Sequence, residues 1–152
     1  MRTRRWIVFV IMAMAMWLVS CIPAPLTEVP PDMVGDWQGE AKIIVAWVEQ
    51  EMLPVALTIH EDGTVEGHVG DATLVSGSIR SNSVGSEYII VADLDGAIVS
   101  TEDVHRDGVK IPMDFDGERF AGGVASTGTK AGGKETMILT ASDLVLHRAT
   151  PT

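Results

Sequence analysis

Short apolar runs rich in β-branched residues alternate with Asp-Gly and Gly-Asp turns along most of this 152-residue chain. The turns recur about every ten residues and no long segment shows helical periodicity, which is typical of an antiparallel sandwich or barrel. The sequence therefore predicts an all-β chain with a single antiparallel domain at residues 34–152. We expect its strands near residues 36–47, 53–60, 64–70, 72–80, 87–94, 109–115, 119–126, 136–141 and 144–148.

Two hairpins can be registered from the alternation of their apolar and polar faces. In the first, a three-residue loop at 61–63 keeps the faces apart, whereas a one-residue slip would exchange every side chain. Gly63 ends this loop, where a positive φ is needed, and the predicted pairs are Ile59–Val65, Leu57–Gly67 and Val55–Val69. In the second, a two-residue turn at Asp116-Gly117 predicts the pairs Met113–Phe120, Ile111–Gly122, Val109–Val124 and Asp114–Arg119.

The amino terminus has the pattern of an export signal. Three arginines precede an uncharged run of 14 residues, Trp6 to Val19, which is short for a membrane-spanning helix of about 20 residues. Leu18-Val19-Ser20-Cys21 then resembles the lipobox of bacterial lipoproteins. The resemblance implies that residues 1–20 are a cleaved signal peptide and that Cys21 becomes the lipidated, palmitate-bearing first residue of a cell-envelope protein. The alternatives are an uncleaved anchor and an ordinary signal peptide.

The same resemblance implies a location and a tether. Ile22 follows the cysteine, whereas Asp at that position favours the inner membrane, so the outer membrane is favoured in an envelope with two membranes. Residues 21–33 hold four of the seven prolines. Because proline favours extended backbone, this segment predicts a semi-rigid spacer that holds the domain off the bilayer.

The charge of the chain excludes several partners. Removal of residues 1–20 takes away three of the eleven basic residues and none of the 21 acidic ones, which leaves a net charge of −13. Such a surface repels nucleic acid and anionic lipid headgroups, so the lipid alone would hold the protein at the membrane.

The single cysteine excludes a disulfide within one molecule.

Gly35-Asp36-Trp37, at the head of the first predicted strand, resembles the Gly-x-Trp start of lipocalin-like (calycin) barrels. The resemblance implies an up-and-down barrel of about eight strands, in which Trp37 plugs one end and Arg148 packs over it as a barrel-closing pair. A β-sandwich with an ordinary core tryptophan is the alternative. A barrel wide enough for a small apolar ligand would line its pocket with Val55, Leu57, Ile59, Val65 and Met113.

Motifs for catalysis or cofactor binding are incomplete. Residues 128–134 fit the Gly-x₄-Gly-Lys part of a phosphate loop, but Glu135 stands where a Mg²⁺-binding hydroxyl is required. Residues 91–102 overlay a calcium loop except at Val91, its first position. This leaves a weak, nonspecific divalent-cation candidate at Asp93, Asp95, Glu102 and Asp103. We therefore expect no enzyme activity, no cofactor and no specific metal.

Together these observations predict a non-catalytic binding or interaction module of the cell envelope. Its partners would be the membrane, through the lipid, and either a small apolar ligand or an envelope protein. A structural accessory subunit of an envelope assembly is one alternative, and a hydrolase of unknown type is another. Trp47 ends a predicted strand beside acidic residues, so it is either a rim aromatic at a pocket mouth or, as is more common, a core or edge tryptophan.

Overall fold

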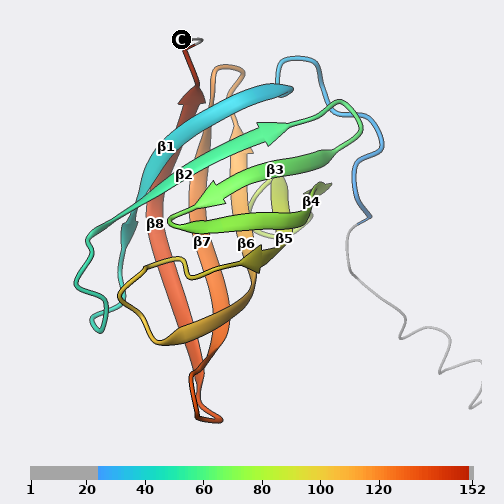
Figure 1. Cartoon of the computed structure of the whole chain (residues 1–152). Helices are drawn as coiled ribbons and strands as arrows, with labels where there is room; N and C mark the ends of the chain where they lie inside the picture. The colour runs from blue at the N-terminus through green and yellow to red at the C-terminus, as the bar shows by residue number, and fades with distance from the viewer. Residues whose placement is uncertain (1–23, 151–152) are drawn as a thin grey trace, which may run out of the picture.

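The chain forms a closed β-barrel in the computed structural model, which describes residues 24–150 (Figure 1). Eight antiparallel strands follow one another in chain order, each hydrogen-bonded to its neighbours, and the last strand pairs with the first. The strands are β1 Gly35–Ile43, β2 Met52–Ile59, β3 Thr64–Val69, β4 Ala72–Ser81, β5 Tyr88–Asp95, β6 Val104–Phe115, β7 Arg119–Lys130 and β8 Thr136–Arg148. The predicted all-β, up-and-down barrel is therefore confirmed, and the sandwich alternative is wrong.

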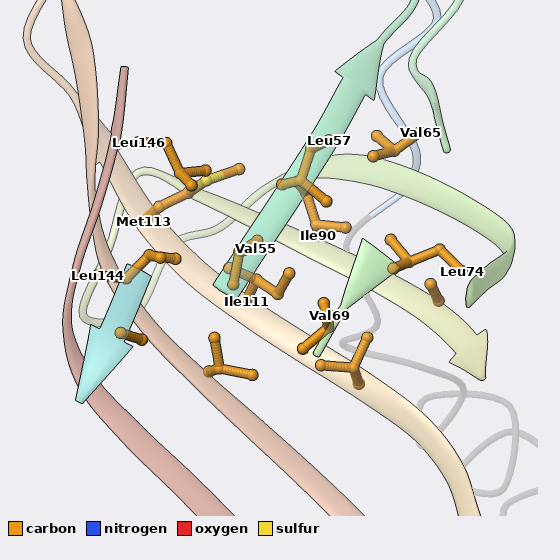
Figure 2. Packing of buried hydrophobic residues seen from close by; sticks show 14 of the residues in the cluster. Val55, Leu57, Val65, Val69, Leu74, Ile90, Ile111, Met113, Leu144 and Leu146 are labelled. Carbon is orange, nitrogen blue, oxygen red and sulfur yellow. The ribbon is translucent and has the colours of Figure 1, made fainter. Parts of the chain in front are cut away.

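Alternation of side chains along each strand builds the core. In β2 the inward residues Leu53, Val55, Leu57 and Ile59 are buried, whereas the residues between them are exposed or half-buried. Figure 2 shows side chains from this strand and its neighbours converging inside the barrel. Burying one such side chain stabilises the fold by about 1.5–3 kcal/mol, so the apolar alternation decides which face of each strand points inward.

The two ends of the barrel differ, and we name each after its tryptophan. The Trp37 end contains the start of β1, the end of β8 and the loops at 60–63, 82–87 and 116–118. The Trp47 end contains the loops at 44–51, 70–71, 96–103 and 131–135. In Figure 1 the Trp37 end runs along the top, from the labelled carboxyl terminus to the upper right, and the Trp47 end is at the lower left.

One of the two predicted hairpin registers is correct. The first is confirmed, because β2 and β3 pair Ile59 with Val65, Leu57 with Gly67 and Val55 with Val69. The second is wrong by two residues, since β6 and β7 pair Met113 with Gly122 and Phe115 with Phe120. A shift of two residues leaves every side chain on its predicted face, which is why the core prediction survives the error.

The error lies in the turn that joins β6 to β7. The Asp116 carboxylate accepts hydrogen bonds from the backbone N–H groups of Glu118 at 3.0 Å and Arg119 at 2.9 Å. These bonds centre the turn on Gly117 and Glu118 instead of Asp116 and Gly117. Gly117 has a φ of 96°, as the first central residue of a type II′ turn requires.

Strand boundaries also depart from the sequence prediction. The predicted strands 136–141 and 144–148 are one strand, β8, which pairs with β1 across a register shift. Asp143 has a φ of 55° at this irregularity, and the extra residue breaks the apolar alternation that the prediction followed. β6 begins at Val104 rather than near residue 109, and β1 ends at Ile43 rather than near residue 47.

From Pro25 onward the proline-rich segment is packed onto the barrel, whereas the sequence predicted a semi-rigid spacer over residues 21–33. Pro25 forms an isolated β-bridge with Arg80 near the end of β4. Val29 and Met33 are only 4% and 1% exposed and belong to the core. The apolar residues between the prolines cover the barrel end, and their burial outweighs the extended, solvated state that the prolines suggested.

The predicted signal peptide at residues 1–20 and the lipobox cysteine, Cys21, lie outside the described residues. Between residues 24 and 150, no helix is long and apolar enough to cross a membrane. The lipoprotein interpretation therefore remains a prediction from the sequence.

Candidate functional site

The Trp37 end is closed by aromatic packing. Trp37 is 1% exposed, and its indole Nε1 donates a hydrogen bond to the carbonyl of Met33 at 2.9 Å. Its ring meets those of Phe120 and Phe115 edge-on, with centroids 4.7 and 5.8 Å away. Edge-to-face contacts at these distances are favourable, so the three rings form a rigid plug.

Arg148 covers this plug from the solvent side. Its guanidinium carbon lies 4.6 Å from the centroid of the Trp37 ring. One Nη donates to the carbonyl of Val34 at 2.9 Å, and the other donates to the carbonyl of Asp32. Gly35 has a φ of 126°, which L side chains rarely adopt, and a Cβ there would lie 2.9 Å from the Arg148 guanidinium, which would have to shift. The pair that the Gly-x-Trp resemblance implied thus lies together, in a structural position.

The five residues predicted to line a ligand pocket lie in the middle of the barrel. All five are at most 2% exposed and belong to one core cluster: Val55, Leu57, Ile59, Val65 and Met113. Figure 2 shows four of them, Val55, Leu57, Val65 and Met113, packed among neighbouring apolar side chains. At this level the barrel is a packed core, and the cavity of interest lies elsewhere.

A cavity of about 450 Å³ opens at the Trp47 end. It is formed by the loops at 44–51 and 96–103 together with the adjoining ends of β6, β7 and β8. Its lining combines apolar and charged residues: Trp47, Val48, Glu49, Val99, Thr101, Glu102, Asp103, Val104, Lys130 and Met137. None of the five predicted pocket residues is among them.

A buried ion pair supports this cavity. The side chains of Arg106 and Glu102 are 0% and 4% exposed. Arg106 donates from Nε to one Glu102 carboxylate oxygen at 3.0 Å and from Nη2 to the other at 2.7 Å. Its Nη1 donates to the carbonyls of Ser126 at 3.3 Å and Met137 at 3.0 Å. A two-pronged pair with further hydrogen bonds is the arrangement in which buried charges are tolerated, and it holds Glu102 rigidly in the cavity wall.

Trp47 stands at the cavity with its ring partly free. It is 42% exposed, and the guanidinium carbon of Arg106 lies 5.6 Å from its ring centroid. The sequence favoured a core or edge position for this residue; the structure instead places it in the lining of a cavity, as the rim alternative describes. An exposed indole beside a buried cation presents a flat apolar surface to a ligand.

The weak divalent-cation candidate is not assembled. Asp93 and Asp95 are exposed on the outer face of β5, while Glu102 faces inward and is held by Arg106. Asp103 is exposed in the lining of the cavity. Within residues 24–150 no group of three metal-ligating side chains lies close enough to hold an ion.

Sequence reasoning missed Arg106 because of a change of face in β6. Extending the inward alternation back from Val109 would place residues 107 and 105 inside and Arg106 outside. A register shift between Arg106 and Gly108 reverses the faces, so Arg106 and Val104 point inward. The one available signal was the spacing of Glu102 and Arg106, which are four residues apart and of opposite charge.

Comparisons of the chain with protein-family models, with curated proteins and with solved structures each gave no match. The architecture itself, a closed antiparallel up-and-down barrel of eight strands, is that of lipocalin-like barrels. Fold alone does not define function, so the function must be argued from the cavity.

Proposed function

We propose that this protein is a lipid-anchored lipoprotein of a bacterial cell envelope, whose barrel is a non-catalytic binding module for a small, mainly apolar molecule. The observation that carries the proposal is the 450 Å³ cavity at the Trp47 end, with an exposed indole in its wall. Ligand sites in proteins commonly measure about 300–1,000 Å³ and combine apolar walls with a few fixed polar groups.

The composition of the cavity wall favours an apolar ligand body. Val48, Val99, Val104 and Met137 supply aliphatic surface, and Trp47 supplies an aromatic face. A methionine adapts its shape to different ligands, and an indole stacks on flat ones. The Arg106–Glu102 pair holds Glu102 in the cavity wall even in the absence of a ligand, so binding requires little rearrangement.

The charges around the cavity favour a neutral or cationic ligand over an anionic one. Besides Glu102, which Arg106 neutralises, the lining contains two acidic residues, Glu49 and Asp103, and one basic residue, Lys130. Without residues 1–20 the whole chain carries a net charge of −13. A field of that sign lowers the local concentration of anions at the cavity mouth.

The same lining supports a non-catalytic role. It includes no histidine, and its one buried carboxylate, Glu102, accepts two hydrogen bonds from Arg106. A general base must be free to take a proton from the substrate. Both oxygens of Glu102 accept hydrogen bonds from Arg106, so the carboxylate is not free to act in this way.

The binding half of the proposal can be tested with a neutral apolar fluorophore, N-phenyl-1-naphthylamine. We expect saturable binding, a large loss of affinity in Trp47→Ala, and little change in Val84→Ala, a control in the exposed loop at the Trp37 end. The anionic analogue 8-anilinonaphthalene-1-sulfonate should bind more weakly. Equal affinities in Trp47→Ala and the parent protein would show that the fluorophore does not bind in this cavity.

The anchor half needs a separate measurement. Mass spectrometry of the mature amino terminus should find a diacylglyceryl-modified Cys21 as the first residue. Cys21→Ser should abolish the diacylglyceryl mass, because the lipid is attached to the Cys21 sulfur. A product that begins at Met1 would contradict the lipoprotein proposal.

A protein partner is a second candidate, supported by exposed apolar residues beside the same end. Ile44, Met52 and Ile138 are 57%, 43% and 56% exposed. Ile44 continues β1 beside β8, since its N–H donates to the carbonyl of Thr140 at 3.0 Å. If they hold an envelope protein, Ile138→Lys should abolish its co-purification with the lipidated chain, whereas fluorophore binding should be unchanged.

A further inference from the structure

The path of the amino-terminal segment determines which end of the barrel lies nearest to the anchor. The N–H of Leu26 donates to the carbonyl of Ile79 at 3.0 Å, beside the bridge between Pro25 and Arg80. Farther along, the N–H of Val29 donates to the carbonyl of Glu61 at 3.1 Å. These contacts lie at the Trp37 end, so the chain enters the barrel there (Figure 1).

The segment is fixed in this position. The segment packs so closely on Gly63 that a Cβ at this residue would lie 2.1 Å from the carbonyl oxygen of Leu26. The carbonyl of Met33 accepts the hydrogen bond of the Trp37 indole, and Arg148 binds the carbonyl of Val34. The entry point is therefore held by the same residues that close the barrel.

Distances along the chain then place the anchor. Cys21 is four residues before Pro25, and four extended residues reach at most ~14 Å. The 13-residue strand β8 runs between the two ends, and at a usual tilt such a strand separates them by roughly 30 Å. The cavity at the Trp47 end therefore lies farther from Cys21 than the link can bridge.

The barrel could still approach the bilayer by lying on its side, but its charge opposes this. Basic clusters hold a flank on anionic lipid at about 1 kcal/mol per Lys or Arg. The chain without residues 1–20 has eight basic against 21 acidic residues. With this excess of acidic residues the barrel wall has few cations to hold it on anionic lipid, which favours the upright orientation.

We infer that the Trp37 end faces the anchoring membrane and that the cavity at the Trp47 end opens away from it. The ligand is accordingly an amphiphile that arrives through the aqueous compartment, and it is not drawn from the bilayer below. The orientation needs only an anchor at or before Cys21, whether lipid or uncleaved signal. The statement about the ligand rests on the proposed function.

The test uses the full, membrane-anchored chain on preformed vesicles. If Cys21 carries lipid, one introduced cysteine gives one labelling site; if the anchor is an uncleaved signal, the Cys21→Ser background gives the same single site. We choose Val84→Cys in the loop at the Trp37 end and Ala131→Cys at the Trp47 end, both exposed. With a nitroxide on the lipid headgroups, a fluorophore at residue 84 should be quenched severalfold more than one at residue 131. Equal quenching, or the reverse order, would overturn the inference.

Access to the cavity is checked on the same vesicles. A bulky, membrane-impermeant thiol reagent should modify Ala131→Cys as fast on vesicles as after detergent release, and protection by the membrane would contradict the orientation. These results are separable from the proposed function. A mature amino terminus without diacylglycerol contradicts only lipidation, and absent fluorophore binding contradicts only the cavity.

Discussion

At each end of the barrel one tryptophan ring contacts an arginine, but the burial of the two partners is reversed. At the Trp37 end the ring is buried and Arg148 lies over it from outside. At the Trp47 end Arg106 is buried and the ring is 42% exposed. A buried indole needs packing and one acceptor for its N–H, here the carbonyl of Met33, whereas a buried cation needs a carboxylate and carbonyls around it. The first arrangement closes the barrel, and the second leaves an aromatic surface free for a ligand.

The comparison predicts its largest effect at the aromatic plug. Trp37→Ala removes the indole that packs against Phe115 and Phe120 and that lies beneath the Arg148 guanidinium. We therefore expect a loss of about 4–5 kcal/mol in unfolding free energy. Urea denaturation measures it. Trp37→Phe, which keeps part of the packing, should lose distinctly less. A loss below about 1 kcal/mol in Trp37→Ala would show that the two ends are not distinguished by burial.

The next effect is at the ion pair. Glu102→Ala leaves Arg106 buried and uncompensated, which costs about 3–5 kcal/mol in general. We expect about 3 kcal/mol, because water entering the adjacent cavity can solvate the guanidinium. The double variant Glu102→Ala/Arg106→Met should recover most of the loss in the same denaturation experiment. A double variant as unstable as the single one contradicts this account.

A much smaller effect on stability is expected for Trp47→Ala. The ring is partly exposed and its cation–π contact with Arg106 is worth about 0.5–1 kcal/mol, so the unfolding free energy should fall by no more than about 1 kcal/mol. Calorimetry or urea denaturation checks this. A loss as large as that of Trp37→Ala would mean that Trp47 is a core residue and that the two ends are equivalent.

The smallest effect concerns acid and is confined to turns of the Trp37 end. Backbone N–H groups of Glu118 and Arg119, with the Arg119 side chain, hold the pKa of Asp116 below its usual 3.8. A lowered pKa in the folded state means that the unfolded state takes up the proton more readily. The stabilisation is therefore complete above about pH 3.8 and is lost as the pH falls through the lower, folded value. Asp116→Asn should remove this pH dependence.

The signal to follow is the amide hydrogen exchange of Glu118 and Arg119. Asp62, whose pKa is lowered by hydrogen bonds from the side chain and backbone of Thr64, provides an independent second turn at the same end. The protection factors of its neighbours, which compare their exchange rates with those of unstructured amides at the same pH, should fall over the same acidic range in both the parent and Asp116→Asn. Unchanged protection factors at Glu118 and Arg119 between pH 5 and the acidic range would refute the assignment.

The sequence predicted the closed end of the barrel better than the open one. Trp37 follows a short motif at the start of β1, and alternation alone placed Val55, Leu57 and Ile59 inside. At the Trp47 end, the register shift in β6 changes faces between Arg106 and Gly108, and alternation cannot foresee such a shift.

Long-range contacts were equally hidden from the sequence. The carboxylate of Glu102 comes from a loop, and Trp47 comes from another loop more than fifty residues earlier in the chain. The turn at Asp116 was placed one residue too early, because its side-chain hydrogen bonds compete with the Asp-Gly preference. The periodicity of apolar residues predicts strands, but it does not predict which loops contact one another.

Arg148 has a consequence for the order in which the molecule folds. It is the last residue of β8, and it binds the carbonyl of Val34 across 114 positions of sequence. Contacts this distant form late, since the intervening chain must be arranged before its ends can meet. Synthesis must therefore be nearly complete before β1 acquires its second neighbour and the indole at its head is covered. Loss of the last three residues of β8 would leave the head of β1, from Trp37 to Gly39, without its partners on that strand.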